Sequence, residues 1–166
     1  MTEASNLPEG AQRVMAALRD AGHAHAPVML DAAARTARQA ADALGVAVGQ
    51  IAKSIIFRRK GDDAAVLVIT SGDRRVDEKK VAALVGKMGR ADAEFVKLKT
   101  GFSIGGVSPV AHATPPVTLI DRELFRFNEI WAAAGHPHGV FKLTPADLQK
   151  LTGAPVADVA LSEEPT

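Results

Sequence analysis

The sequence predicts an α+β domain whose sheet is mixed and largely antiparallel. Two β-branched runs at residues 51–58 and 64–70 are joined by a polar five-residue segment, which is typical of a hairpin. Segments with helical capping residues lie on both sides of these runs and do not alternate strictly with strands. A chain of 166 residues can bury a core of its own. We therefore expect one domain over residues 1–166 and not a doubly wound nucleotide fold.

Two helices are expected before the hairpin. The first begins near Asn6, which has the spacing of a capping pair with Glu9, and ends before Gly22. The second is shorter and extends from a Thr36 cap to Gly45, which suits a left-handed C-terminal position. The apolar face of the first helix consists of Ala11, Val14, Met15 and Leu18.

A third helix is expected over residues 77–85, with Gly86 as its stop. Apolar runs at residues 117–120, 129–134 and 139–143 predict three further strands. The inward-facing residues of the third helix are expected to be Val81, Leu84 and Val85.

The last helix is expected to begin at Thr144 and to end by Gly153. Thr144 is a good N-cap, and Pro145 suits the first helical position because its missing N–H is not needed there. The tail at residues 162–166 is expected to fray.

Composition excludes several classes of protein. The chain has no cysteine, which excludes disulfides, thiolate nucleophiles and cysteine-ligated metal centres and suits a reducing cytoplasm. The segment from Met1 to Glu9 lacks the features of an export signal, and no apolar stretch approaches the ~20 residues that span a bilayer. We expect a cytoplasmic protein without membrane contact.

Charge is distributed unevenly along the chain. The net charge is +1, but residues 53–99 hold 12 Lys and Arg against 7 Asp and Glu, and the rest holds 8 against 12. A local basic field suits a partner with a few phosphates better than duplex DNA. A solvated charged face would give the same pattern. With no Tyr and one Trp, the chain lacks the aromatic surface of a protein that stacks single-stranded bases.

The segment from Thr100 to Pro109 contains three glycines, two serines and a proline between regular elements. Glycine lets backbone N–H groups come close to a ligand, so several amides can converge on one oxyanion or phosphate. This glycine loop is the first candidate for a functional site.

A serine hydrolase is one interpretation of the same loop. Residues 101–105 match the Gly-x-Ser-x-Gly nucleophile elbow around Ser103, and Asp121 and then His136 or His138 follow in the chain order of that class. The elbow requires a strand before the serine and a helix after it. Residues 105–109 oppose a helix because they include two glycines and a proline.

Lys53 lies in a strongly apolar strand, where it shares a face with Ile55 and Phe57. Such a cation either extends to an edge of the sheet or binds an anion. Asp121 ends another predicted strand, where a carboxylate can cap the next turn or orient a group of a site.

Two histidine pairs, His23 with His25 and His136 with His138, have spacing that can bind a metal. Neither pair has a carboxylate or a further histidine at motif spacing, so we expect no metal. His138 can instead exchange a hydrogen bond with a ligand in a cleft, or it is simply a turn residue.

Five segments resemble the YbaK and prolyl-tRNA editing domain family in sequence and in order, over about residues 36–158. These segments are Lys53–Phe57, Ser71–Asp77, Thr100–Pro109, Ile120–Asp121 and Ala134–His138. The resemblance implies a mixed sheet curved toward a barrel and surrounded by helices. It also implies a freestanding relative of the editing domain of bacterial prolyl-tRNA synthetase, which hydrolyses the ester of misacylated tRNA.

The family pattern implies which residues form the site. Lys53 is expected near the terminal adenosine, and the glycine loop is expected to support the aminoacyl group. His138 is preferred to His136 because it lies closer to the short apolar strand that follows. The catalytic residues implied are Lys53, Gly106, Asp121 and His138. The substrate-binding residues implied are Gly101, Phe102, Ser103, Gly105, Val107, Ser108 and Pro109.

The implied partners are the acceptor end of an aminoacyl-tRNA and a prolyl-tRNA synthetase, with no cofactor. Two alternatives remain besides the deacylase. One is a small serine esterase that uses Ser103. The other is a noncatalytic module that binds tRNA or a synthetase through a basic patch, which consists of Lys53, Arg58, Arg59, Arg74, Arg75 and Lys79.

Overall fold

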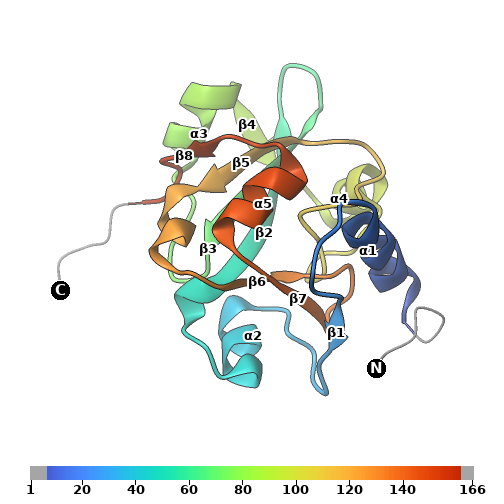
Figure 1. Ribbon diagram of the computed structural model, residues 1–166. Helices are drawn as coiled ribbons and strands as arrows, with labels where there is room; N and C mark the ends of the chain where they lie inside the picture. The colour runs from blue at the N-terminus through green and yellow to red at the C-terminus, as the bar shows by residue number, and fades with distance from the viewer. Residues whose placement is uncertain (1–6, 162–166) are drawn as a thin grey trace.

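The computed structural model describes residues 7–161, in which five α-helices surround one eight-stranded mixed sheet (Figure 1). The helices are α1 (Glu9–Asp20), α2 (Ala37–Leu44), α3 (Glu78–Val85), α4 (Ala93–Thr100) and α5 (Pro145–Thr152). The strands are β1 (Val28–Met29), β2 (Ile51–Arg59), β3 (Ala65–Ser71), β4 (Met88–Arg90), β5 (Val117–Asp121), β6 (Ile130–Ala133), β7 (Gly139–Leu143) and β8 (Val156–Ala157). The predicted α+β class is confirmed.

The sheet has the order β1-β7-β6-β2-β3-β5-β8, and β4 also pairs with β2. Over residues 7–161, β1 with β7, β6 with β7, and β2 with both β3 and β4 are antiparallel. The remaining pairs, β2 with β6, β3 with β5 and β5 with β8, are parallel. The predicted hairpin is confirmed as β2 and β3, with an unbroken register from Ala52 opposite Ser71 to Arg58 opposite Ala65.

One edge of β2 is interrupted. Opposite β3, this edge pairs with β6 only at Ile51 and Ala52 and with β4 only over residues 57–59. Between these pairings, residues 53–56 have no neighbouring strand in the described part of the chain. The fold thus leaves an opening in the sheet beside Lys53.

Most predicted helices begin and end where their capping residues indicate. Thr36 forms a capping box at the start of α2, and Gly45 ends that helix with φ of 70°. Thr144 forms the same motif at α5, with Pro145 as the first helical residue. In α1 all four predicted core residues are buried, whereas the predicted Asn6 cap lies outside the described residues, as does the tail at residues 162–166.

Two predictions near α3 need correction. Leu84 was expected to face inward, but 56% of its surface is exposed, while Val81 is fully buried. The glycine loop was expected to begin at Thr100, but Thr100 is the last residue of α4 and Gly101 is its left-handed C-cap. The sequence signal for α4 was weak because Leu98, at the centre of the helix, is 72% exposed. The adjoining three-residue strand β4 was also missed.

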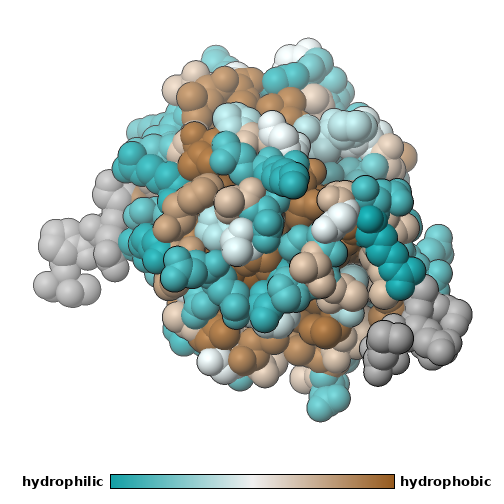
Figure 2. All heavy atoms as spheres, viewed as in Figure 1, coloured by the Kyte–Doolittle hydropathy of each residue, from teal (hydrophilic) through white to brown (hydrophobic). Residues whose placement is uncertain are grey.

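The main core lies between the sheet and the helices α1, α4 and α5. In Figure 1, α5 crosses the front of the sheet, α1 and α4 lie side by side at the right, and α2 lies at the bottom. Figure 2 shows hydrophobic residues between hydrophilic ones on this face, most clearly in the lower part of the view, where Figure 1 has α2 and β1. None of the helices within residues 7–161 is long and apolar enough to cross a bilayer.

Candidate active site

A cavity of about 190 Å³ lies beside the interrupted edge of β2. Its walls come from β2, from α2 and the residues just before it, from β6, from the start of β7, and from the glycine loop. The side chains are mostly small and apolar. Its lining residues include Ala37, Ala40, Ile51, Ala52, Val107, Ala132 and Val140. The cavity therefore suits a small ligand with an apolar part.

Lys53 lines this cavity, and its ammonium group donates a hydrogen bond of 3.4 Å to the main-chain carbonyl of Arg74. Burial lowers the pKa of Lys53, and the nearby charge of Arg75 lowers it further, while Asp73 opposes the shift. The strand thus holds a cation beside an apolar cavity, with only a neutral carbonyl as its hydrogen-bond partner. An anionic or strongly dipolar ligand would stabilise this charge.

The glycine loop supplies free backbone donors to the cavity. Gly105 and Val107 both line it, and within residues 7–161 their N–H groups donate to no other group. The N–H of Gly106 donates instead to the carbonyl of Ser103 at 3.0 Å. Two donors left unpaired at one cavity fit the role of binding a carbonyl oxygen or an oxyanion.

Gly106 packs directly against the turn that carries the histidines. A Cβ atom on Gly106 would lie 2.9 Å from the carbonyl carbon of His136 and 3.0 Å from its Cα and N atoms. Only glycine therefore allows the loop to approach this turn so closely.

The two histidines lie together, with ring centres 5.4 Å apart. The N–H of His138 donates to Nδ1 of His136 at 3.1 Å, and Nδ1 of His138 lies 3.0 Å from the carbonyl of Leu30. Because a carbonyl only accepts, Nδ1 of His138 carries the proton and Nε2 is left as an acceptor. Burial lowers the pKa of His136, with further contributions from His138 and Arg35. Neither ring lines the cavity, but Gly139, next to His138, does.

Arg35 forms the rim between α2 and the glycine loop. It lines the cavity, and its Cγ atom would lie 3.4 Å from a Cβ atom on Gly105. Within the described residues its guanidinium makes no hydrogen bond or ion pair. The sequence did not single out Arg35, because an arginine before a helix cap is ordinary on a protein surface.

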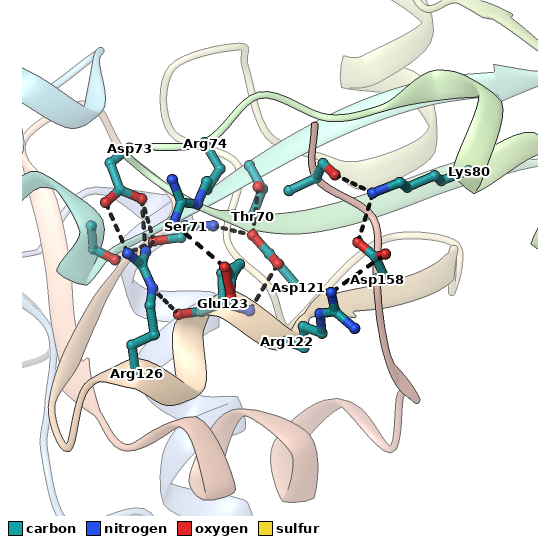
Figure 3. A network of polar contacts seen from close by, with 12 residues as sticks. Thr70, Ser71, Asp73, Arg74, Lys80, Asp121, Arg122, Glu123, Arg126 and Asp158 are labelled. Carbon is teal, nitrogen blue, oxygen red and sulfur yellow. Dashed lines mark hydrogen bonds and ion pairs between the residues drawn. The ribbon is translucent and has the colours of Figure 1, made fainter. Parts of the chain in front are cut away.

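Asp121, predicted as a catalytic residue, does not line the cavity. It is fully buried, and its Oδ2 atom accepts hydrogen bonds from the hydroxyl of Thr70 at 2.9 Å and from the N–H of Ser71 at 3.0 Å (Figure 3). Its Oδ1 atom accepts from the N–H of Glu123 at 2.9 Å. Asp121 thereby fixes the end of β3, from which the turn with the Arg74 carbonyl begins.

Ionic contacts hold the same turn from outside (Figure 3). Arg126 donates to Asp73 and to the hydroxyl of Ser71, each at 2.8 Å. Arg74 forms an ion pair with Glu123 at 3.4 Å. The carbonyl that receives Lys53 therefore belongs to a turn that is held at several points.

Replacement of Asp121 by Asn is expected to lower the free energy of unfolding by about 1.5–3 kcal/mol, because the amide leaves an N–H donor facing other donors. Denaturation in urea measures this change. Asp158→Asn is the matched control, since Asp158 forms exposed ion pairs with Lys80 and Arg122 and should change stability by less than about 1 kcal/mol. A stable but inactive Asp121→Asn protein would contradict the structural role.

Four of the predicted substrate-binding residues are held elsewhere by the fold. Phe102 is buried in the main core beneath the guanidinium of Arg13. The carbonyl of Gly101 accepts a hydrogen bond from Arg13, and the buried hydroxyl of Ser108 accepts from Val110. The fourth, Pro109, lines a separate hollow of about 360 Å³. Of the predicted set, the cavity is lined by Lys53, Gly105 and Val107.

Ser103 is exposed, and its surroundings differ from those of a nucleophile elbow. The helix α4 precedes the loop where the elbow needs a strand, and within the described residues no helix follows before β5. No hydrogen bond joins Ser103 to a histidine there.

The basic patch of the binding-module hypothesis is partly neutralised. Arg58 pairs with Asp63 at 2.8 Å and Arg59 with Asp62 at 2.7 Å. The hydrogen bond from Arg59 lowers the pKa of Asp62 to about 2. The remaining cations of the patch include Lys53, which lines the cavity. Within residues 7–161, no three histidine or carboxylate side chains gather closely enough to hold a metal ion.

Comparison with known proteins agrees with this arrangement. The aminoacyl-tRNA editing domain matches residues 31–151, which is most of the chain. The chain belongs to this family. It is also 36% identical over 118 residues to the uncharacterized protein YwhH of Bacillus subtilis (strain 168), covering 70% of this chain and 74% of that protein. A 78-residue match of 36% identity to proline--tRNA ligase of Thermosipho africanus (strain TCF52B) covers 46% of this chain but 14% of the ligase.

Solved structures place the editing domain in the same fold. The crystal structure of a proposed trans-editing enzyme for prolyl-tRNA synthetase is similar with a TM-score of 0.88 and 43% identity, and the match covers 95% of this chain and all of the other. The crystal structure of hypothetical protein APE2540 gives a TM-score of 0.83 and 29% identity, over 90% of this chain and 99% of that one. The predicted family and fold are therefore confirmed.

Proposed function

We propose that this editing domain is a deacylase that acts in trans on misacylated tRNA, specifically a tRNA(Pro)-related substrate that carries a small amino acid. One observation carries the proposal. A small apolar cavity is bordered by the half-buried cation of Lys53 and by the unpaired N–H groups of Gly105 and Val107. These are the groups that an aminoacyl ester needs, with its small side chain, its carbonyl oxygen and its adjoining nucleotide.

The reaction requires little from the protein beyond orientation and charge stabilisation. An aminoacyl ester is already activated, so a water molecule attacks the carbonyl carbon and the bond to the ribose oxygen breaks. That oxygen leaves with a proton, which gives a free amino acid and a free tRNA end. Backbone donors that stabilise the oxyanion are worth roughly 2.7–4 kcal/mol each in other enzymes. In this scheme the ribose hydroxyl helps to orient the water, Lys53 holds the adenosine end, and His138 supports that end.

Selectivity follows from the volume of the cavity. One methylene changes binding in an apolar pocket by only ~1–3 kcal/mol, which explains why synthetases need a second hydrolytic step. A cavity of about 190 Å³ admits a small side chain and excludes large ones. The partners in this proposal are the acceptor end of the tRNA and a prolyl-tRNA synthetase, and the place of action is the cytoplasm.

A panel of radiolabelled aminoacyl-tRNAs tests the proposal directly. The panel contains tRNA(Pro) charged with alanine, serine, threonine, cysteine or proline, and hydrolysis is followed with and without EDTA. Selective release of one small amino acid, insensitive to EDTA, is the expected result. Binding of the tRNA without hydrolysis of any ester would contradict the deacylase and favour the noncatalytic module.

Replacement of Ser103 by Ala is expected to lower deacylation less than about tenfold, because water rather than the hydroxyl attacks the ester. Loss of a true serine nucleophile would remove most of the catalysis, on the order of a millionfold. Single-turnover hydrolysis of the best substrate from the panel separates the two mechanisms. Complete inactivation of a folded Ser103→Ala protein would establish the esterase instead.

A further inference from the structure

Two buried polar atoms of the cavity walls have no hydrogen-bond partner. Within residues 7–161, the buried side-chain atoms without a partner are the hydroxyl oxygen of Ser54 and the indole nitrogen of Trp131. Both residues line the same cavity. Buried polar atoms are nearly always paired, because an unpaired one destabilises the fold. Two such atoms at one cavity indicate that a ligand completes their hydrogen bonds.

The polar side chains that line the cavity are mostly donors. They are Arg35, Thr36, Lys53, Ser54 and Trp131. Arginine, lysine and the indole of tryptophan only donate hydrogen bonds. The hydroxyl of Thr36 accepts from the N–H of Gln39 at 3.1 Å in the capping box of α2. The hydroxyl of Ser54 is therefore the one side-chain acceptor of the cavity that no other group uses.

The main chain of Ser54 faces the cavity side of β2 as well. The N–H of Arg59 donates to Ala64, in the segment that leads into β3, and the register between β2 and β3 is unbroken. Successive residues of a strand direct their main-chain groups to alternate edges. The N–H and C=O of Ser54 therefore point to the interrupted edge, where no strand pairs with them in the described part of the chain.

The acyl part of an aminoacyl ester has one group that needs acceptors, namely its α-amino group. Near the cations Arg35 and Lys53 this amino group has few partners, because the other polar side chains of the cavity donate. We propose that Ser54 binds the α-amino group of the aminoacyl ester through its hydroxyl oxygen. This assignment rests on the proposed deacylase function. The indole N–H of Trp131 is left for an acceptor of the same ligand.

The ligand reaches the hydroxyl by a change of side-chain rotamer. Ser54 as a residue is half-buried and lines the cavity, but its oxygen is shielded from water. A serine side chain has three staggered positions about χ1, and rotation among them turns the hydroxyl toward the ligand. The unpaired state of the free protein is then replaced by a paired state in the complex.

The test compares an amino ester with its desamino counterpart. The substrates are the tRNA ester that the wild type hydrolyses fastest and the same ester without the α-amino group, such as propionyl in place of alanyl. Ser54→Ala is expected to lower kcat/KM for the amino ester roughly tenfold, as for loss of one hydrogen bond to a polar substrate group, and to leave the desamino ester unchanged. Its melting temperature should be equal to or above that of the wild type, because an unpaired hydroxyl is removed. Thr114→Ala, an exposed hydroxyl outside the cavity, is the matched control.

Several outcomes would overturn the assignment. Equal losses with both esters would mean that Ser54 only shapes the cavity, and unchanged rates with both would mean that it binds nothing. A clear fall in melting temperature would show that the hydroxyl is paired in the free protein. If the wild type hydrolyses neither ester, the proposed function fails. Binding of the non-hydrolysable alanyl and propionyl amides of tRNA to wild type and Ser54→Ala then decides the role of Ser54 alone.

Discussion

Gly106→Ala is expected to reduce the rate of aminoacyl ester hydrolysis by at least about a hundredfold, because the added methyl group displaces the glycine loop from the cavity. The Cβ atom would lie within 3.0 Å of three backbone atoms of His136, and backbone cannot rotate away as a long side chain can. Either the loop moves or the histidine turn moves. In both cases the N–H groups of Gly105 and Val107 leave their positions at the cavity.

Single-turnover hydrolysis and thermal melting together measure this effect. Overpacking of this kind lowers stability by about 1–3 kcal/mol, so the variant should still fold at low temperature. Gly61→Ala is the matched control, because a Cβ atom there has no neighbour within 4 Å. A fully active Gly106→Ala protein would show that the loop need not approach the histidine turn, and would remove the structural basis of the proposed site.

Local signals in the sequence predicted elements well where a capping residue and a glycine enclosed an apolar stripe. The helix α2 is a clear case, since Thr36 and Gly45 occupy the capping positions that their side chains favour. The helix α4 was missed despite similar caps, Asp92 and Gly101, because its apolar residues do not form one face. Periodicity fails when a short helix exposes a large apolar residue.

The site was predictable in part, and the limits have a physical cause. Lys53 was recognisable as a cation in an apolar strand, and the glycine loop by its composition. Ser54 carried a similar signal, as a polar residue in the same strand, but alternation alone gave it no ligand. Arg35 and Trp131 could not be found, because they reach the cavity only through the pairing of distant segments.

Lys53→Met is expected to lower the rate with aminoacyl-tRNA by about 10- to 100-fold, the effect of losing a hydrogen bond to a charged group. Methionine keeps the length of the side chain and removes the charge. Hydrolysis of a simple amino acid ester without adenosine should be unchanged, because the proposed contact of Lys53 is with the nucleotide. Lys60→Met, at an exposed lysine of the β2–β3 turn, is the control. Equal losses with both substrates would contradict the contact with adenosine.

The same variant should be as stable as the wild type or more stable at neutral pH. Burial lowers the pKa of Lys53 below its ordinary value of 10.5, so the fold disfavours the charged form. Between the lowered pKa and 10.5 the unfolded chain binds more protons at Lys53 than the folded chain, and stability from this residue rises with pH. Lys53→Met removes that pH dependence, which melting curves across the alkaline range can measure.

Activity should follow the opposite direction in that pH range. As pH rises through the lowered pKa, Lys53 loses the proton that makes it a cation, and the enzymatic rate with aminoacyl-tRNA should fall. Spontaneous ester hydrolysis accelerates with pH and has to be subtracted with a reaction that lacks protein. An alkaline fall present in the wild type and absent from Lys53→Met would assign the titration to Lys53. The same fall in both proteins would assign it to another group, and the charge of Lys53 would then not be what holds the substrate.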